Sequence, residues 1–329
     1  MPQSIRAILL LFFVLVSSLL AAHPQTVHAS DHPTLEFPNC DSGKPLRIVA
    51  YGDQRFADPA ITKGTNPRVR EWLAGRVADE KPQLLLLTGD TPFIGSQAAD
   101  WKDFQLESAP WQAANILTLP TIGNHEVRDN ADAGIKNYLD NFPAIQRHRY
   151  YSALCGPVEV ISLDMNSPLG RASEQMRWFA AQLDHIPAQV RFLFILFHMP
   201  WMADQQSQMV ANLPTHGAII LRDLLEAHQH AIHARVVVVN GHIHNYERFE
   251  RKGVEYIITG GGGAEPYPIL LRGEEDLYKE PGFPVYNYVT MDILNGKLTA
   301  TMWKVTDPDA PTLSVEIKDR FTLTAPPKR

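Results

Sequence analysis

Five short apolar runs along this chain each end directly in a polar motif, and this pattern constrains the fold more than any other feature. The runs with their motifs read LRIVAYGD, LLLLTGD, LTLPTIGNHE, RFLFILFHMP and RVVVVNGHIH. Amphipathic helical patterns such as SEQMRWFAAQLDHI, with Ser173 as a cap, separate several of them. Continuous apolar runs of strand length that alternate with helices are typical of parallel strands buried on both faces. The sequence therefore predicts an α/β protein.

The last quarter of the chain has a different pattern. After residue 253 it consists mainly of strand-like segments, with Asn295-Gly296 as a tight turn between two of them. Further upstream, RYYSALCGPVEVISLD predicts two strands joined at Gly156-Pro157. Two sheets packed face to face, with helices on the outside, accommodate both the buried parallel strands and the antiparallel ending.

The first 29 residues are predicted to lie outside this fold. Arg6 precedes AILLLFFVLVSSLLAA, an apolar run with the length of a signal-peptide core and short for a membrane span. The small residues of VHA at 27–29 place the cleavage before Ser30. We predict a signal peptide at 1–29 and a single domain at 30–329, with an uncleaved signal anchor as the alternative. In either case the protein is expected to be exported, into a periplasm or the extracellular space.

Charge and cysteine content limit the partners. The formal net charge is −6 and no long basic run occurs, so nucleic acid is not expected as a partner. After signal cleavage no membrane span is expected. Cys40 and Cys155 are the only cysteines. Export permits a disulfide, but the sequence leaves a bridge and two free thiols equally open, and it does not indicate the oligomeric state.

The polar residues after the five runs predict a metal site, because ligands of open α/β sheets bind beyond the carboxyl ends of the strands. The candidate ligands are Asp53, Asp90, Asn124, His198, His242 and His244. They offer oxygen and nitrogen but no thiolate, which suits Zn²⁺, Mn²⁺ or Fe. They also exceed the needs of one tetrahedral ion, so we predict two divalent ions that share a carboxylate. Such a pair can bind both oxygens of a phosphoryl transfer and lower the pKa of a bridging water.

Local features of these motifs allow other interpretations. A single GD after a strand is more often a turn in which the aspartate bonds its own backbone, so only the ordered set is a strong signal. Glycines precede four of the candidate ligands, Asp53, Asp90, Asn124 and His242. We interpret these glycines as permitting tight turns that direct each side chain outwards.

The ordered motifs GD, GD, GNHE, H and GHIH, over residues 52–244, resemble those of the calcineurin-like metallophosphoesterase family. GHIHNYER and the helix SEQMRWFAAQLD are similar to segments of its purple-acid-phosphatase-like branch. The resemblance implies a four-layer α/β/β/α sandwich of two mixed β-sheets flanked by helices. It also implies a phosphatase or phosphodiesterase in which a metal-bound hydroxide attacks phosphorus in line. The substrate would be a phosphorylated small molecule or a cell-surface molecule.

The resemblance also implies roles for single residues. Asp90 matches the carboxylate that bridges the metals. The remaining ligands of one metal match Asn124, His198 and His242, and those of the other match Asp53 and His244. His125 matches the histidine that contacts the substrate, where a proton donor or a cation can stabilise the leaving oxygen.

Two positions depart from the family pattern. The family carries a ligating histidine where this chain has Arg55, and the purple branch carries a tyrosine where it has Phe93, so no charge-transfer tyrosine is expected. A guanidinium cannot ligate a cation, because it has no lone pair to offer and stays charged. Arg55 could bind the substrate phosphate, the role we favour; it could pair with Asp53 in place of a metal; or it could lie on the surface.

These departures support a second hypothesis, a non-hydrolytic protein that binds a phosphorylated ligand on the same scaffold with a degenerate first metal site. The loops expected to shape the pocket span residues 91–115, 126–150 and 199–216. Their aromatic residues could stack on a base or pack in the core: Phe93, Trp101, Trp111 and Trp201.

Overall fold

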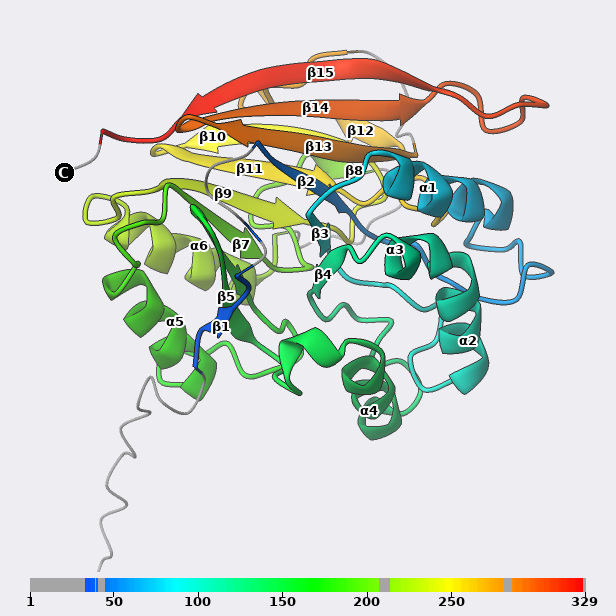
Figure 1. The fold of residues 1–329 in the computed structure, drawn as a ribbon, viewed down its shortest axis with the longest axis horizontal. Helices are drawn as coiled ribbons and strands as arrows, with labels where there is room; N and C mark the ends of the chain where they lie inside the picture. Colours follow the sequence, from blue (N-terminus) through cyan, green and yellow to red (C-terminus); the bar gives the residue numbers. More distant parts are fainter. Residues whose placement is uncertain (1–32, 39, 41–44, 207–213, 281–285, 328–329) are drawn as a thin grey trace, which may run out of the picture.

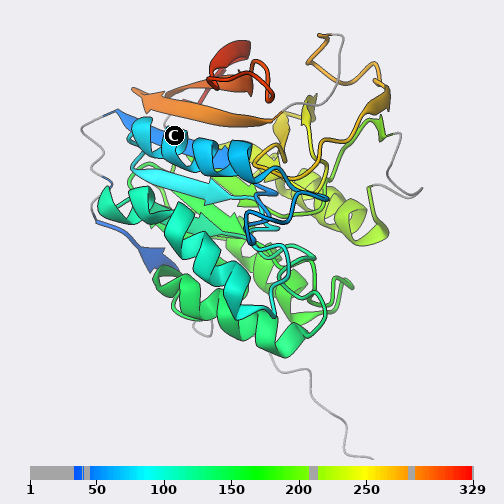
Figure 2. The same ribbon diagram turned by 90° about the vertical axis from the view of Figure 1, so that its right-hand side faces the viewer.

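The computed structural model describes residues 33–38, 40, 45–206, 214–280 and 286–327. The predicted signal peptide therefore lies outside the described residues. Two mixed β-sheets pack face to face, with α5 and α6 on one side of the molecule and α1 to α3 on the other (Figure 1). Turned by 90°, the helices of the N-terminal half lie in front of the strands (Figure 2). The predicted four-layer α/β/β/α sandwich is confirmed.

The strands form two large sheets and one small one. The seven-stranded sheet contains, in spatial order, β1 (Leu35–Glu36), β5 (Tyr151–Cys155), β6 (Val158–Ser162), β7 (Phe192–Leu196), β9 (Arg235–Asn240), β11 (Val254–Thr259) and β10 (Tyr246–Arg251). The six-stranded sheet contains β15 (Val315–Thr324), β14 (Lys297–Val305), β13 (Asn287–Leu294), β2 (Leu46–Tyr51), β3 (Leu84–Leu87) and β4 (Leu117–Pro120). The small sheet pairs β8 (Gln205–Gln206) with β12 (Ile269–Leu271).

Six α-helices lie in the described residues, and in four of them a side chain caps a free amide of the first turn. They are α1 (Pro67–Asp79), α2 (Ala98–Glu107), α3 (Ala109–Ala113), α4 (Ala131–Asn141), α5 (Glu174–Asp184) and α6 (His216–His228), with a 3₁₀ turn at Pro143–Ile145. The predicted cap of α5 is present, since Ser173 Oγ accepts from the Met176 amide at 3.4 Å. Asn66 caps α1 in the same way and is followed by proline, which suits the first helical position. No helix among the described residues has both the length and the apolar character to cross a membrane.

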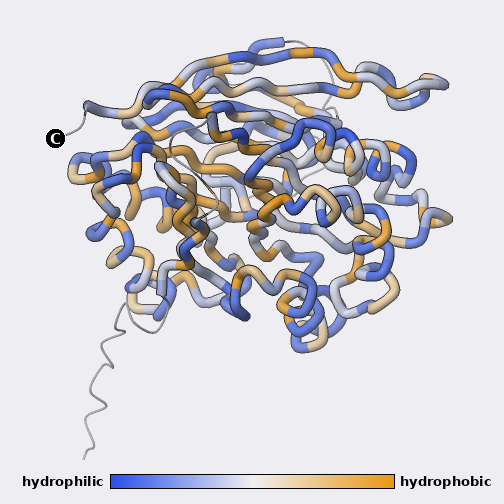
Figure 3. Tube along the Cα trace, in the orientation of Figure 1, coloured by the Kyte–Doolittle hydropathy of each residue, from blue (hydrophilic) through white to orange (hydrophobic). Residues whose placement is uncertain are grey.

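The central strands are buried on both faces, which explains their continuous apolar runs. One apolar cluster takes residues from both sheets and from α1 to α4, and a second lies between the seven-stranded sheet and helices α5 and α6. Successive residues of β7 alternate between them: Phe192, Phe194 and Leu196 belong to the first, and Leu193 and Ile195 to the second. Apolar residues accordingly gather in the strands at the centre of the molecule (Figure 3).

Two predicted turns and one open question are resolved by the structure. β5 and β6 form an antiparallel hairpin across Gly156-Pro157. Asn295 and Gly296 both have positive φ, of 52° and 73°, which fits a two-residue hairpin between β13 and β14. Cys40 and Cys155 form a disulfide across 115 residues, with their Cα atoms 5.0 Å apart.

Candidate metal centre

The ends of five parallel strands bring the predicted ligands to one edge of the sandwich. Strands β2, β3 and β4 are mutually parallel, and so are β7 and β9 in the other sheet. Asp53, Asp90 and Asn124 follow the first three, and His198 and His242 follow the other two. The side chains of Asp53, Asp90 and His198 are fully buried, and one ligand atom of each lies within 4.8 Å of the others.

Several of these residues occupy a strained backbone conformation. Asp53, Asp90 and His242 have φ values of 58°, 54° and 68°, and Arg55 has 54°. Positive φ in residues other than glycine costs of order 1–3 kcal/mol and is concentrated at functional sites. The left-handed turn is thus made at the candidate ligands themselves.

The neighbouring glycines have a different role from the predicted one, because only Gly89 among the four has a positive φ. Instead three of them make room for candidate ligands, and Gly52 makes room for the Thr88 side chain. A Cβ on Gly89 would lie 2.6 Å from His198 Nδ1, and one on Gly241 would lie 2.6 Å from Asp53 Oδ2. A Cβ on Gly123 would lie 2.3 Å from Asp90 Oδ1. A left-handed backbone angle therefore explains only Gly89, whereas the close approach of a side chain explains all four glycines.

One group of ligand atoms surrounds a common point. His198 Nε2 lies 3.2 Å from each of Asn124 Oδ1, His242 Nδ1 and Asp90 Oδ1, and His242 Nδ1 lies 3.1 Å from Asn124 Oδ1. Ligands bonded at 2.0–2.1 Å to a tetrahedral ion lie about 3.3 Å apart, so this spacing fits a bound metal. His198 is oriented by its other ring nitrogen, which bonds the Thr88 carbonyl at 2.7 Å.

A second group lies on the other side of Asp90. His244 Nε2 is 3.5 Å from Asp53 Oδ1, and His244 is oriented by Nδ1, which donates to the Glu265 carbonyl at 2.6 Å. Asp53 Oδ1, Asp90 Oδ2 and His244 Nε2 are buried and have no hydrogen-bond partner among the described residues. Buried lone pairs without a partner are costly, and a divalent cation would satisfy all three. The residues present therefore fit a metal centre in which Asp90 faces both groups.

The pKa values of the candidate ligands also fit a metal site. Burial alone would raise the pKa of Asp90, but the neighbouring His198 and His125 hold it well below its usual range. For His198 the two effects are reversed: burial alone would lower its pKa, but the neighbouring Asp90 raises it to about 9. Burial and the nearby His198 lower the pKa of His242 to about 3. The buried carboxylates thus hold a proton on His198, and a metal ion that binds there would displace it.

His125 lies beside the two groups. Its Nε2 is 3.7 Å from Asp90 Oδ2, and its side chain is 7% exposed. Its Nδ1 is 2.5 Å from the carbonyl oxygen of Phe93, which can only accept, so Nδ1 carries a hydrogen. Nε2 is therefore the atom that faces the site, and it can donate a proton only when the ring is charged.

Arg55 points into the site. Its side chain is 12% exposed, with Nη2 3.7 Å from Asp90 Oδ2 and Nη1 3.2 Å from the Gly64 carbonyl. The interpretation of Arg55 as a surface residue does not describe this position, and its nearest carboxylate contact is with Asp90 rather than Asp53. Phe93 brings no phenol to the site; its ring lies under the Arg128 guanidinium.

Sequence reasoning assigned no role to Glu126, the last residue of GNHE. Its buried carboxylate accepts the backbone amides of Asp90, Thr91 and Gly123 at 3.1, 2.9 and 2.8 Å. Glu126 thus ties the loop after β3 to the loop after β4. The signal available in the sequence was its place in the motif, but a glutamate next to a loop gives no indication that it is buried.

Glu126→Ala is expected to lower the free energy of unfolding by about 3 kcal/mol or more, because three buried amides lose their acceptor at about 1–3 kcal/mol each. Activity should fall as well, since Asp90 loses its support. Chemical denaturation checks the first result. The control is Glu159→Ala, because Glu159 is a buried carboxylate whose Oε1 accepts only from the Ser152 hydroxyl. Equal loss of activity in the two variants would contradict the positioning role of Glu126.

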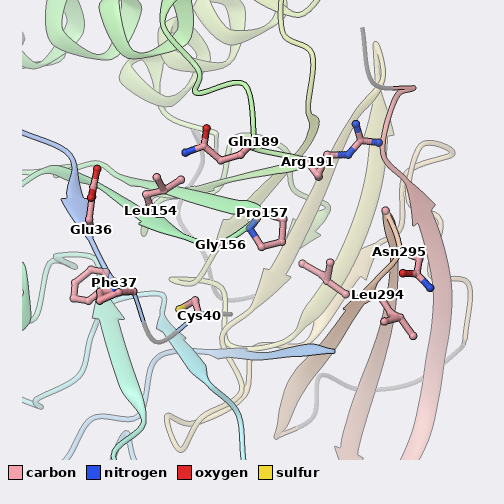
Figure 4. Close-up of a pocket in the computed structure, with 13 residues that line it drawn as sticks. Glu36, Phe37, Cys40, Leu154, Gly156, Pro157, Gln189, Arg191, Leu294 and Asn295 are labelled. Atoms are coloured by element: carbon pink, nitrogen blue, oxygen red, sulfur yellow. The ribbon is translucent and has the colours of Figure 1, made fainter. Parts of the chain in front are cut away.

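Other predicted pocket features lie elsewhere. Trp101, Trp111 and Trp201 are core residues with at most 2% exposure, so they pack rather than stack on a ligand. A cavity of about 880 Å³ is lined by residues that include Phe37, Cys40, Arg191 and Leu294 (Figure 4). It opens at the start of β7, whereas the candidate metal centre lies beyond the end of that strand.

Comparison with known proteins gives a consistent result. A model of the family described as calcineurin-like phosphoesterase matches residues 27–246. Purple acid phosphatase 21 of Arabidopsis thaliana is 24% identical over 279 residues, which cover 77% of this chain and 57% of the relative. Purple acid phosphatase 18 of the same plant is 26% identical over 263 residues, with 70% and 55% covered. This chain thus spans little more than half the length of these relatives.

Among solved structures, purple acid phosphatase PPD1 from yellow lupin (Lupinus luteus) superposes with a TM-score of 0.70 at 16% identity, covering 87% of this chain and 55% of that one. The family-model match confirms the predicted calcineurin-like family, and the chain is similar to purple acid phosphatases within it. The buried group of Asp53, Asp90 and His198 is compatible with the divalent metal cofactors of that family. The chain belongs to the calcineurin-like phosphoesterase family.

Proposed function

We propose that this protein is an exported phosphatase or phosphodiesterase whose substrate binds at the metal centre formed by Asp53, Asp90, Asn124, His198, His242 and His244. The observation that carries the proposal is the position of Asp90 between two groups of ligand atoms. Its Oδ1 lies 3.2 Å from His198 Nε2 in one group, and its Oδ2 is one of the buried atoms without a partner in the other. Divalent metals bound there would lower the pKa of a water and neutralise charge on phosphoryl oxygens.

The protein's own residues supply the rest of the proposed mechanism. The oriented imidazoles of His198 and His244 and the carboxylates of Asp53 and Asp90 fix the site on rigid strand ends. A charged His125 can give its Nε2 proton to the leaving oxygen. The Arg55 guanidinium can bind the non-reacting phosphoryl oxygens, where charge builds up during in-line transfer.

Export and domain organisation form part of the same proposal. The signal-like segment at 1–29 supports export, and so does the disulfide between Cys40 and Cys155, because such bridges persist in oxidising compartments. We assign residues 30–329 to a single metallophosphoesterase domain. A phosphorylated small molecule or cell-surface molecule in the periplasm or outside the cell would be its substrate.

The proposal is tested with purified protein loaded separately with Zn²⁺, Mn²⁺ and Fe and offered an aryl phosphate monoester and the matching diester. We expect hydrolysis of at least one ester, loss of that activity after chelation and recovery when metal is returned. Absence of hydrolysis with every metal would contradict the proposal.

The alternative function, binding without turnover, is favoured by one observation: a guanidinium occupies the place of a metal ligand beside Asp90. The fold alone does not decide, since GAP50, described as an anchor in the inner membrane complex of Plasmodium, superposes at a TM-score of 0.61 with 15% identity, covering 87% of this chain and 90% of that one.

Arg55→His separates the two functions. Under the hydrolase proposal it removes a phosphate contact, so kcat/KM for the aryl phosphate should fall about 10-fold or more. A rise in activity would support the degenerate binding site instead, because the new imidazole restores a ligand. Arg222→His, on α6 away from the site, is the matched control and should leave kcat/KM unchanged.

A further inference from the structure

The glycine-rich segment after β11 returns to the metal centre. The Ala264 amide donates to the Asp53 carbonyl at 2.8 Å, and the Tyr267 amide donates to the His244 carbonyl at 3.2 Å. The rings of Tyr267 and His244 are stacked, with centroids 3.9 Å apart and planes at 22°. Tyr267 thus covers a candidate ligand and is held to it by both backbone and ring.

The side chain of Tyr267 also lies near Arg55. Burial raises the pKa of Tyr267, and the positive charge of the Arg55 guanidinium opposes this rise. A guanidinium only donates, so Arg55 cannot accept the hydroxyl hydrogen of Tyr267, and a bound anion could accept it. Tyr267 is half-buried rather than enclosed.

We propose that Tyr267 is a substrate-binding residue that donates its hydroxyl hydrogen to a phosphoryl oxygen beside Arg55. The inference rests on the proposed function, and it names a residue outside the strand-end motifs. Arg55 and Tyr267 would then form a pair of donors that arrive from different segments of the chain. The substrate class they fit is an ester with at least two free phosphoryl oxygens, because each donor needs an acceptor of its own.

Tyr267→Phe tests this with little disturbance, because phenylalanine keeps the ring that stacks on His244 and removes only the hydroxyl. In the metal-loaded protein, the affinity for inorganic phosphate measured by calorimetry should fall about 10-fold or more, the loss of one hydrogen bond to a charged oxygen. The kcat/KM for an aryl phosphate should fall by a similar factor. Metal content should equal that of the wild type.

The matched control is Tyr278→Phe, which removes a tyrosine hydroxyl from the same part of the chain and should change none of these values. Unchanged phosphate affinity in Tyr267→Phe would overturn the inference. So would a loss of metal, or a visible iron charge-transfer band in the wild type that Tyr267→Phe removes, because either would make Tyr267 a metal ligand instead of a donor to substrate.

Phosphate binding is read without turnover, so the two proposals can fail separately. If the wild type hydrolyses no ester but Tyr267→Phe still weakens phosphate binding, the hydrolase proposal fails and the assignment of Tyr267 stands. If the wild type hydrolyses esters and Tyr267→Phe changes neither phosphate binding nor kcat/KM, the hydrolase proposal stands and the assignment of Tyr267 fails.

Discussion

Asp90→Asn is expected to lower kcat/KM for an aryl phosphate by about 10³-fold or more, because one substitution removes the charge that both ligand groups share. Asp90 Oδ1 lies 3.2 Å from His198 Nε2, and Oδ2 lies 3.7 Å from both the Arg55 guanidinium and His125 Nε2. Asparagine carries no negative charge, so the variant no longer balances the positive charge of a bound metal or of the cationic side chains around residue 90.

The fold of this variant should survive, because asparagine has nearly the same shape and its carbonyl can still accept from the His125 amide, now 2.9 Å from Asp90 Oδ1. Asp100→Asn is the control: Asp100 accepts the Ile94 amide and is also largely buried, but it contacts no candidate ligand. Thermal unfolding and initial rates of both variants check the result. More than a tenth of wild-type activity in Asp90→Asn would contradict the bridging role.

Cys155→Ser is expected to lower the free energy of unfolding by about 4–5 kcal/mol, since the disulfide with Cys40 closes a loop of more than 100 residues in the unfolded chain. Cys155 ends β5, and Cys40 lies between β1 and β2, so the bridge ties the N-terminal segment to the seven-stranded sheet. Denaturant unfolding under oxidising conditions measures the change.

Cys40→Ser should give the same loss, and the double variant no more than either single one, because all three remove one bridge. Adding a reductant should destabilise the wild type and leave the variants unaffected. A loss below about 1 kcal/mol would show that the bridge does not stabilise the protein. Activity per folded molecule should persist in each variant, because the disulfide lies far from the candidate ligands.

The fold was largely predictable because burial on both faces leaves a clear pattern in the sequence. β7 and β9 are apolar at every central position since each side of the sheet is covered, and this is what identified them as parallel strands. The hairpin at Asn295-Gly296 was predictable for a local reason, because few residue pairs adopt two positive φ values.

Elements set by long-range contacts were harder to predict. Helix α4 lies within 126–150, which was expected to be a loop. Gly134 weakens the helical pattern of this segment. A Cβ there would lie 1.9 Å from the Glu126 carbonyl, so packing against the GNHE loop requires glycine. Strand β10 overlaps the GHIHNYER motif and was not predicted, since its identity depends on pairing with β11.

In the candidate site, too, local features were predictable and long-range contacts were not. The ligand positions could be predicted because each directly follows a strand. The roles of Glu126 and Tyr267 could not be predicted. The role of Glu126 depends on a buried carboxylate that reaches amides of two loops, and that of Tyr267 depends on a segment outside the motifs that returns to stack on His244. The sequence also did not indicate whether the Arg55 side chain faces the site, because Arg55 has a positive φ angle that the sequence does not predict.

Metal content is the most direct measurement of the central claim that Asp53, Asp90 and the surrounding imidazoles bind divalent ions together. Purified wild-type protein and Asp90→Asn would be equilibrated with Zn²⁺, Mn²⁺ or Fe, passed over a desalting column and analysed by mass spectrometry for bound metal per chain. We expect about two ions in the wild type and a clear loss in the variant. A wild type that retains no metal, or a variant that retains as much as the wild type, would contradict the account.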